Sequence, residues 1–194
     1  MSGIQLIFAT NNTNKVIEIQ SVIPAGIQVV SLAEAGINID IPEPHHTLEA
    51  NATEKSTVIH QLTHKNCFSE DTGLEVAALN GKPGVKSARY AGEGRSFDDN
   101  IDKLLGRLQQ ANSRLARFRT VISLILDGKE YFFEGICPGK IIMERKGNNG
   151  FGYDPVFVPD GSDKTFAEMD MAQKNKFSHR KKAMEKLIGF LSER

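Results

Sequence analysis

The sequence has little cysteine, no excess of charge of either sign and no long apolar run. In 194 residues, 24 lysine and arginine side chains balance 24 aspartate and glutamate side chains. This balance argues against a protein that coats nucleic acid or lies on a membrane surface. No apolar run approaches the ~20 residues that a membrane helix needs. We therefore expect neither nucleic acid nor membrane as a partner, although a local basic pocket is compatible with this composition.

The two cysteines, Cys67 and Cys137, lie in apolar, strand-like segments and form no CxxC or Cys/His spacing. This pattern is typical of core residues in a reduced, cytoplasmic protein. The first residues show no basic segment followed by a long apolar stretch, so we expect no signal peptide. The sequence has no internal repeat and no low-complexity linker. A hydrophobic content of 40% suffices for one sizeable core, or for two lobes that share one sheet.

A polar loop follows the first predicted strand. Residues 4–9 are nearly all apolar, as in a buried strand of an α/β sheet, and apolar residues at helical spacing begin at Val16. The loop between them consists of Thr10, Asn11, Asn12, Thr13, Asn14 and Lys15. A loop that leads into a helix N-terminus offers free N–H groups to an anion, and a lysine in the first turn favours phosphate there. A capped helix with a solvent-exposed lysine accounts for the pattern about as well.

A second group of polar residues flanks a helix predicted over residues 48–64. Prolines on either side of Glu43 exclude helix there and would present its carboxylate on a rigid turn. Thr47 is the predicted N-cap, and Asn51 and Lys55, four residues apart, project from one stripe of the helix. The expected buried face consists of Leu48, Ala52, Ile59 and Leu62. Taken alone, the polar residues are more typical of a solvated surface.

Two adjacent acids, Glu70 and Asp71, follow the apolar residues Cys67 and Phe68, where we expect a strand to end. Because consecutive strand residues point to opposite faces, the two acids can share a site only if the backbone bends, which Gly73 permits. A carboxylate at a strand end suits Mg²⁺, which takes few protein carboxylates and leaves its other positions to water and phosphate. An acidic turn is the more common explanation of this segment taken alone.

The middle of the chain predicts structural elements. Ser96 begins a capping box before a helix whose apolar stripe includes Phe97 and Ile101. Alternating apolar residues predict a strand over residues 115–126, and residues 129–136 are the predicted returning strand. Asp127 and Gly128 between them are typical of a type I′ hairpin turn.

A glycine-rich loop over residues 147–155 carries Phe151, Gly152, Tyr153 and Asp154. Aromatic rings on such a loop can stack on a nucleobase. Asp154 can accept hydrogen bonds from a base edge or from a backbone turn.

The last predicted helix begins with basic residues. Ser178 is its predicted N-cap, His179 and Arg180 lie in its first turn, and Lys174 lies just before it. Cations there oppose the helix dipole, and a bound anion or a carbonyl-rich ligand would relieve the conflict. A basic surface run and a nucleic-acid patch are the alternatives.

In their order along nearly the whole chain, these motifs resemble those of the inosine triphosphate pyrophosphatases, which hydrolyse noncanonical purine nucleoside triphosphates. The most specific are Phe-Gly-Tyr-Asp-Pro at residues 151–155 and Ser-His-Arg at residues 178–180. The resemblance implies one α/β domain over residues 1–194, with an elongated mixed β-sheet flanked by helices and two lobes around a central substrate cleft. It also implies a homodimer that needs Mg²⁺ and cleaves ITP, dITP and XTP between the α- and β-phosphates.

The resemblance further implies roles at the phosphate end of the substrate. Asp71 would bind Mg²⁺ and help to activate the attacking water, and Glu43 would be a second metal ligand. Thr72 would form a hydrogen bond near the phosphates. The triphosphate would be neutralised by Lys15, Lys55 and Lys174.

At the base end, Phe151 and Tyr153 would line the pocket, together with Gly152 and Asp154 of the same loop. His179 and Arg180 would donate to the 6-carbonyl group of hypoxanthine or xanthine. Adenine presents an amino group at that position, so it would be rejected by an unpaired donor as well as by a lost bond.

Two positions depart from the family pattern. Asn11 stands where many members have glycine, and we expect it to take the glycine conformation. Glu70 stands where many bacterial members have aspartate, so its contact with the metal is open. Three alternative functions also stay open: a pyrophosphatase for modified pyrimidine nucleotides, a module that binds single-stranded nucleic acid, and a catalytically inactive nucleotide sensor. Base selectivity in activity assays would distinguish the pyrimidine pyrophosphatase from the purine enzyme. Binding that weakens steeply with salt would indicate the nucleic-acid module.

Overall fold

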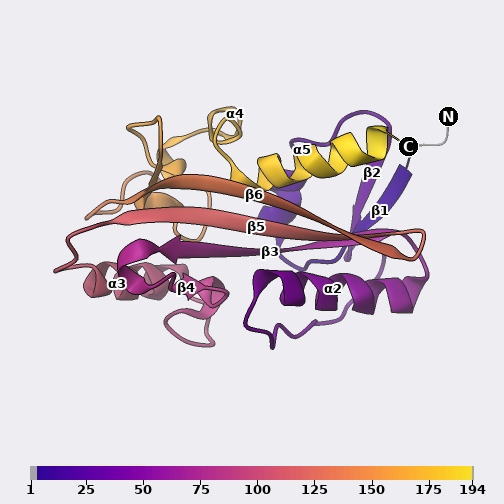
Figure 1. Ribbon diagram of the computed structural model, residues 1–194, viewed down its shortest axis with the longest axis horizontal. Helices are drawn as coiled ribbons and strands as arrows, with labels where there is room; N and C mark the ends of the chain where they lie inside the picture. The colour runs from indigo at the N-terminus through magenta and orange to yellow at the C-terminus, as the bar shows by residue number, and fades with distance from the viewer. Residues whose placement is uncertain (1–3, 194) are drawn as a thin grey trace. The chain divides into compact units, whose positions relative to one another are not determined.

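The computed structural model describes residues 4–193, which form a mixed β-sheet flanked by helices (Figure 1). The strands are β1 (Ile4–Phe8), β2 (Ile27–Ser31), β3 (Cys67–Val76), β4 (Pro83–Gly84), β5 (Leu115–Leu126), β6 (Lys129–Ile141) and β7 (Phe157–Pro159). Their order in the sheet is β2-β1-β3-β5-β6-β7, with β4 paired to β3. β1 runs parallel to β2 and β3, whereas β4 and β7 are antiparallel to their partners. The predicted α/β class with a mixed sheet is confirmed.

Five α-helices lie in the described part of the chain. They are α1 (Thr13–Gln20), α2 (Leu48–Thr63), α3 (Phe97–Arg107), α4 (Met171–Lys174) and α5 (His179–Ser192). Short 3₁₀ turns occur at Ala77–Leu79, Ser87–Arg89, Asp154–Val156 and Phe166–Glu168. Over residues 4–193, none of the helices has the length and apolar character to cross a membrane.

The chain divides into two compact units, and β3, β5 and β6 contribute residues to both. Within the described residues, unit 1 consists of 4–71, 120–135 and 180–193, and unit 2 consists of 72–119 and 136–179.

The strands of unit 1 are buried on both faces. Leu6 and Phe68 pack with Ile19 of α1 and Leu187 of α5. The alternate strand residues, such as Cys67, pack with Ile59 of α2. Because successive side chains of a strand point to opposite faces, α1 and α5 cover one face and α2 covers the other. Figure 1 shows α2 and α5 on either side of the strands.

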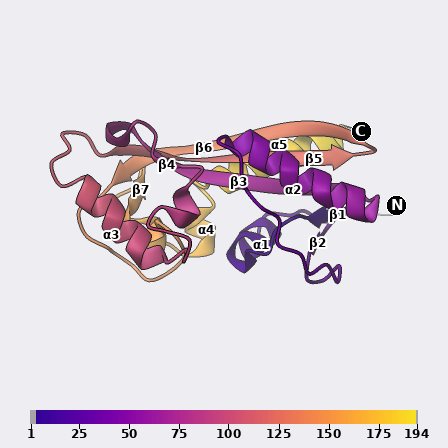
Figure 2. The ribbon, with the colours of Figure 1, turned by 90° about the horizontal axis from the view of Figure 1, so that it is seen from below.

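The predicted strand–loop–helix unit at the start of the chain is confirmed. β1 pairs with β2 in a register that joins Ile4 to Ile27 and Phe8 to Ser31. Figure 2 shows α1 beside these two strands. Asn12 is the N-cap of α1, and its side chain accepts from the N–H groups of Asn14 and Lys15.

Unit 2 has a core of its own. Leu74, Phe118 and Phe157 from its strands pack with Ile101 and Leu104 of α3. Ser96 caps α3 as predicted, since its hydroxyl accepts from the Asp99 N–H group.

The predicted type I′ turn that joins β5 to β6 is also confirmed, because Asp127 and Gly128 both have positive φ, at 50° and 76°.

The predicted strand end at Glu70 and Asp71 is wrong, because β3 continues without interruption to Val76. Gly73 therefore serves close packing and not a bend: a Cβ atom there would lie 2.8 Å from the carbonyl oxygen of Gly84 in the paired strand. The expectation for Asn11 is also wrong. Within residues 4–193 the positive φ values of non-glycine residues fall elsewhere, at His64, Asn80, Arg95 and Asp127.

Two residues predicted to be buried are exposed. Leu62, in the last turn of α2, is 56% exposed, and Phe97, the first residue of α3, is 44% exposed. Conversely, Asn51 and Lys55 are buried, although their pattern is typical of a solvated pair. They are buried because both contact the Asp71 carboxylate of β3.

Candidate active site

The polar residues of α2, β3 and the proline-flanked turn meet in unit 1. The Lys55 ammonium lies 2.7 Å from Glu43 Oε1 and 3.3 Å from Asp71 Oδ1. Asn51 Nδ2 donates to Asp71 Oδ2 at 3.2 Å. Two carboxylates distant in sequence therefore share one cation.

Asn51 also fixes the turn that carries Glu43. Its Oδ1 accepts from the His45 N–H group at 2.9 Å, and its Nδ2 contacts the His45 carbonyl oxygen at 3.4 Å. Thr47 begins α2 one turn earlier, and its hydroxyl accepts from the Ala50 N–H group. The buried amide of Asn51 thus bridges the Glu43 turn and the Asp71 carboxylate.

Burial and charge oppose each other in this cluster. Burial alone would lower the pKa of Lys55, but the carboxylates of Asp71 and Glu43 outweigh it and the pKa is raised. Burial raises the pKa of Asp71; Lys55 and Lys15 oppose the rise, and Glu43 adds to it. Asp71 is thus a buried carboxyl whose ionised form depends on nearby cations.

Glu70 lies on the opposite face of β3, among different partners. It accepts two hydrogen bonds from Arg180, at 2.8 Å from Nε and 3.0 Å from Nη2. Lys15 lies 3.0 Å from its Oε1, and Glu18 of α1 binds the Nη1 group of the same arginine. The two acids of the motif therefore do not share a site.

In this second cluster the pKa of Glu70 is lowered and that of Arg180 is raised. Burial would raise the pKa of Glu70, but the charges of Arg180 and Lys15 reverse the effect and hold it well below its usual range. Burial would lower the pKa of Arg180, and the carboxylates of Glu70 and Glu18 raise it instead. These carboxylates of the protein itself offset the charge of Arg180 in the first turn of α5, where we had expected a bound ligand to do so.

The predicted phosphate loop is ordered by its own side chains. Asn12 Oδ1 accepts from the N–H groups of Asn14 and Lys15 at 3.0 and 3.2 Å. Thr10 Oγ1 accepts from the Asn12 N–H group, and Asn11 Nδ2 donates to the Ile39 carbonyl oxygen. Two of the N–H groups expected to serve an anion therefore already have a partner.

The remaining predicted residues belong to unit 2. Asp154 Oδ2 accepts from Lys174 Nζ at 2.5 Å and from the Phe151 N–H group at 2.9 Å. The Lys174 ammonium also lies 5.3 Å from the centroid of the Phe151 ring and 5.2 Å from that of Phe166. Asp154 and Lys174 together hold the Phe151 loop from both its backbone and its ring.

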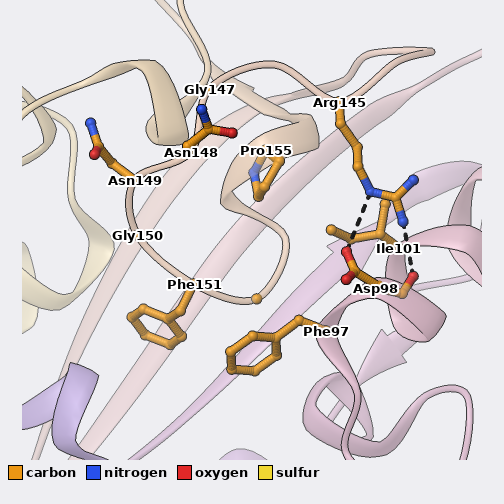
Figure 3. A pocket seen from close by; sticks show the side chains of 11 residues that line it. Phe97, Asp98, Ile101, Arg145, Gly147, Asn148, Asn149, Gly150, Phe151 and Pro155 are labelled. Atoms are coloured by element: carbon orange, nitrogen blue, oxygen red, sulfur yellow. Dashed lines mark hydrogen bonds and ion pairs between the residues drawn. The ribbon is translucent and has the colours of Figure 1, made fainter.

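The other aromatic residues of unit 2 differ in environment. Tyr153 lies in the core, where its hydroxyl donates to the Ser87 carbonyl oxygen at 2.9 Å, and burial raises its pKa. His179 stacks on Phe118, with ring centroids 4.7 Å apart and 12° between the planes. Thr72 lies half-buried in β3. Of the two rings predicted to meet a base, that of Phe151 borders the pocket shown in Figure 3.

The donor set in unit 1 can be tested against Mg²⁺. Within residues 4–193, no group of three or more histidine, cysteine or acidic side chains is arranged to hold a metal ion. Mg²⁺ commonly binds one or two protein carboxylates and completes its shell with water and phosphate oxygens. Asp71 and Glu43, which already converge on one cation, fit that small donor set.

Sequence reasoning missed Glu18. It follows Lys15 by three residues on α1, so both lie on one side of the helix, and this spacing was the available signal. What the sequence could not indicate was its partner, because Arg180 lies 162 residues further along the chain.

Comparisons with known proteins agree on one family. The profile of the Ham1 family matches residues 6–190. A protein of Flavobacterium johnsoniae named dITP/XTP pyrophosphatase is 50% identical over 97% of this chain and 98% of its own length. One of Bacillus subtilis with the same name is 42% identical over 96% of each chain. A solved Ham1 protein of Coxiella burnetii has a TM-score of 0.89 at 34% identity, covering 98% of this chain and all of its own. The solved Ham1 protein of Staphylococcus aureus has a TM-score of 0.87 at 39% identity, covering 97% of this chain and 98% of its own.

Proposed function

Because the chain belongs to the Ham1 family, we propose that it hydrolyses noncanonical purine nucleoside triphosphates, among them dITP, ITP and XTP. The products would be the nucleoside monophosphate and pyrophosphate. The structural observation that supports this proposal is the buried cluster in which Asp71 and Glu43 share the Lys55 ammonium. We further propose a cytoplasmic homodimer as the working form.

Asp71 is the proposed base of the reaction. The oxygen of a water molecule attacks the α-phosphorus, the bond from that phosphorus to the bridging oxygen of the β-phosphate breaks, and pyrophosphate leaves. Asp71 accepts the proton that the water loses. Asp71 and Glu43 would hold Mg²⁺, which supplies Lewis acidity toward the phosphate oxygens when bound.

The lysines are proposed to bind the triphosphate. Lys55 is held between two carboxylates, so its charge is fixed in the cluster before substrate arrives. Lys15 is likewise held by Glu70, and Lys174 by Asp154. Cations fixed in advance need little rearrangement when phosphate charge develops.

The base would be read by His179 and Arg180 through its 6-carbonyl group. Three of the hydrogen bonds of Arg180 go to Glu70 and Glu18, which orient its guanidinium. Hydrogen-bond donors aimed at a carbonyl group discriminate strongly against an amino group.

The identity of the products tests this reaction. Protein would be incubated with Mg²⁺ and each of ITP, dITP, XTP, ATP and GTP, and the phosphorus products followed by ³¹P NMR. We expect pyrophosphate and monophosphate from the first three, with little turnover of ATP. Release of orthophosphate with a nucleoside diphosphate would contradict cleavage between the α- and β-phosphates. Turnover of modified pyrimidine nucleotides alone would favour the pyrimidine alternative.

A further inference from the structure

A pocket of about 400 Å³ lies within unit 2, between the start of α3 and the glycine-rich loop. Phe97 and Phe151 contribute aromatic rings to its wall, and Arg145 and Asn148 contribute polar groups. Its size falls in the range of small-molecule sites, and its lining combines apolar rings with a few polar groups, as such sites commonly do.

The ring of Phe97 is placed where packing does not require it. Phe97 is the first residue of α3, and the buried side of that helix is formed by Ile101 and Leu104 instead. The centroids of the Phe97 and Phe151 rings are 6.2 Å apart, with 47° between their planes. Figure 3 shows the two rings side by side, brought together from α3 and from the loop.

The backbone on the α3 side of the pocket is fixed. Arg145 Nη2 donates to the Asp98 carbonyl oxygen at 3.0 Å and to Asp102 Oδ1 at 2.8 Å. Its Nε lies 3.7 Å from Asp98 Oδ1, and Ser96 caps the same turn. These contacts hold the turn that carries Phe97.

The loop side is fixed as well. The Asn149 N–H group donates to the Ala167 carbonyl oxygen at 3.0 Å, and its side chain donates to that of Met169 at 3.1 Å. A Cβ atom on Gly147 would lie 2.2 Å from the Ala167 backbone. The backbone that carries the Phe97 and Phe151 rings is therefore held by hydrogen bonds before a ligand binds. This lowers the entropic cost of binding.

We propose that Phe97 is a further specificity-determining residue, and that with Phe151 it forms a two-ring wall for the purine base of the substrate. This inference rests on the proposed function, since the base is that of the same nucleotide. A purine offers two fused rings for contact with the two side chains, whereas a pyrimidine offers one. Phe97 thus selects for base size.

Kinetics of Phe97→Ala test the proposal. Base–aromatic stacking is worth about 1–3 kcal/mol per base, which corresponds to about a 5- to 140-fold loss of affinity. We expect KM for ITP to rise within that range, with kcat within about twofold of the wild type. Phe97→Tyr keeps the flat ring and restores KM, whereas Phe97→Leu keeps apolar area only and restores it in part. Phe132→Ala is the matched control, because Phe132 is 50% exposed on β6 and lies outside the pocket.

Binding of inosine monophosphate, measured by calorimetry, separates this inference from the proposed function. An unchanged KM and an unchanged Kd in Phe97→Ala, with normal hydrolysis of ITP by the wild type, would overturn the inference and leave the function standing. Equal losses in Phe97→Ala and Phe132→Ala would also overturn it. A wild type that does not hydrolyse ITP, but binds inosine monophosphate more tightly than Phe97→Ala does, would support the pocket and contradict the function.

Discussion

Glu70 and Asp71 show how strongly the neighbours of a carboxyl group decide its chemistry. They are adjacent in sequence and both buried, at 1% and 6% exposure. Arg180 and Lys15 lower the pKa of Glu70 despite burial, whereas burial raises the pKa of Asp71 against the opposing charge of Lys55. We therefore assign Glu70 to the ion-pair network of α1 and α5, and keep Asp71 as the proposed base.

Glu18 is predicted to stabilise the fold through this network. Removing one partner of a buried ion pair leaves the other charge unpaired and commonly costs about 3–5 kcal/mol. We expect Glu18→Ala to lower the free energy of unfolding by about 3 kcal/mol in urea titrations. The control is Glu185→Ala, which removes an exposed pair with Lys181 and should cost less than about 1 kcal/mol. Equal effects of the two substitutions would contradict the role given to Glu18.

Cys67 is predicted to be chemically inert in the folded protein. Burial raises the pKa of its thiol to about 12, so almost none of it is thiolate at neutral pH. In a Cys137→Ser background, we expect alkylation of Cys67 at pH 8 to be slow in buffer and complete within minutes in guanidinium chloride. Fast labelling of the native protein would show that the thiol is accessible.

The same raised pKa predicts a loss of stability in alkali. From pH 9 to 12 the unfolded thiol loses its proton while the folded thiol keeps it, so the unfolded state binds fewer protons and stability falls as pH rises. The slope of this contribution is about −1.4 kcal/mol per pH unit. Chemical unfolding at several pH values above 9 should show a steeper decline for the wild type than for Cys67→Ala.

At the scale of elements, helix α2 determines where the Asp71 cluster lies. One side of α2 packs into the core, and its polar residues contact β3 and the Glu43 turn. Asn51 and Lys55 each contact Asp71. Ser69, on the same face of β3 as Asp71, donates to the Ala52 carbonyl oxygen of α2. The position of the cluster therefore depends on where α2 begins and how it is rotated.

The N-cap of α2 gives a prediction at this scale. The Thr47 hydroxyl accepts from the Ala50 N–H group, and Thr47→Ala should lower the free energy of unfolding by about 1 kcal/mol. Thr47→Ser keeps the acceptor and should restore most of it. Thr57→Ala, within the same helix, should be neutral or slightly stabilising because alanine is the better helix former. A loss from Thr57→Ala as large as that from Thr47→Ala would argue against a capping role.

Local pattern predicted most elements, and long-range contact accounts for the failures. Thr47, Ser96 and the Asp127–Gly128 turn signal their structures through neighbouring residues alone. The uninterrupted course of β3 through Asp71 and Gly73 could not be predicted in this way, because it depends on pairing of Leu74 with Gly84 in β4. Residue type alone likewise does not show that Lys55 is buried, since its partners come from two other segments.

At the scale of the whole molecule, nearly full-length similarity to named pyrophosphatases supports a function that the sequence motifs had already indicated. Several parts of that account stay predictions: the substrate cleft, the homodimer, the Mg²⁺ requirement and the site residues themselves. The motifs predict which residue types the chemistry needs. Their partners, such as Glu18 for Arg180 and Phe97 for Phe151, become visible only after folding.

Pyrophosphate release from ITP by the wild type and by Asp71→Asn, with and without Mg²⁺, tests the central claim most directly. We expect Mg²⁺-dependent release by the wild type, and a loss of at least about 100-fold in kcat/KM in the variant, since a positioned base commonly contributes that much or more. Asp163→Asn, at an exposed position, should retain full activity, and circular dichroism should show that both variants are folded. Full activity of a folded Asp71→Asn variant, or no release from ITP by the wild type, would contradict the account.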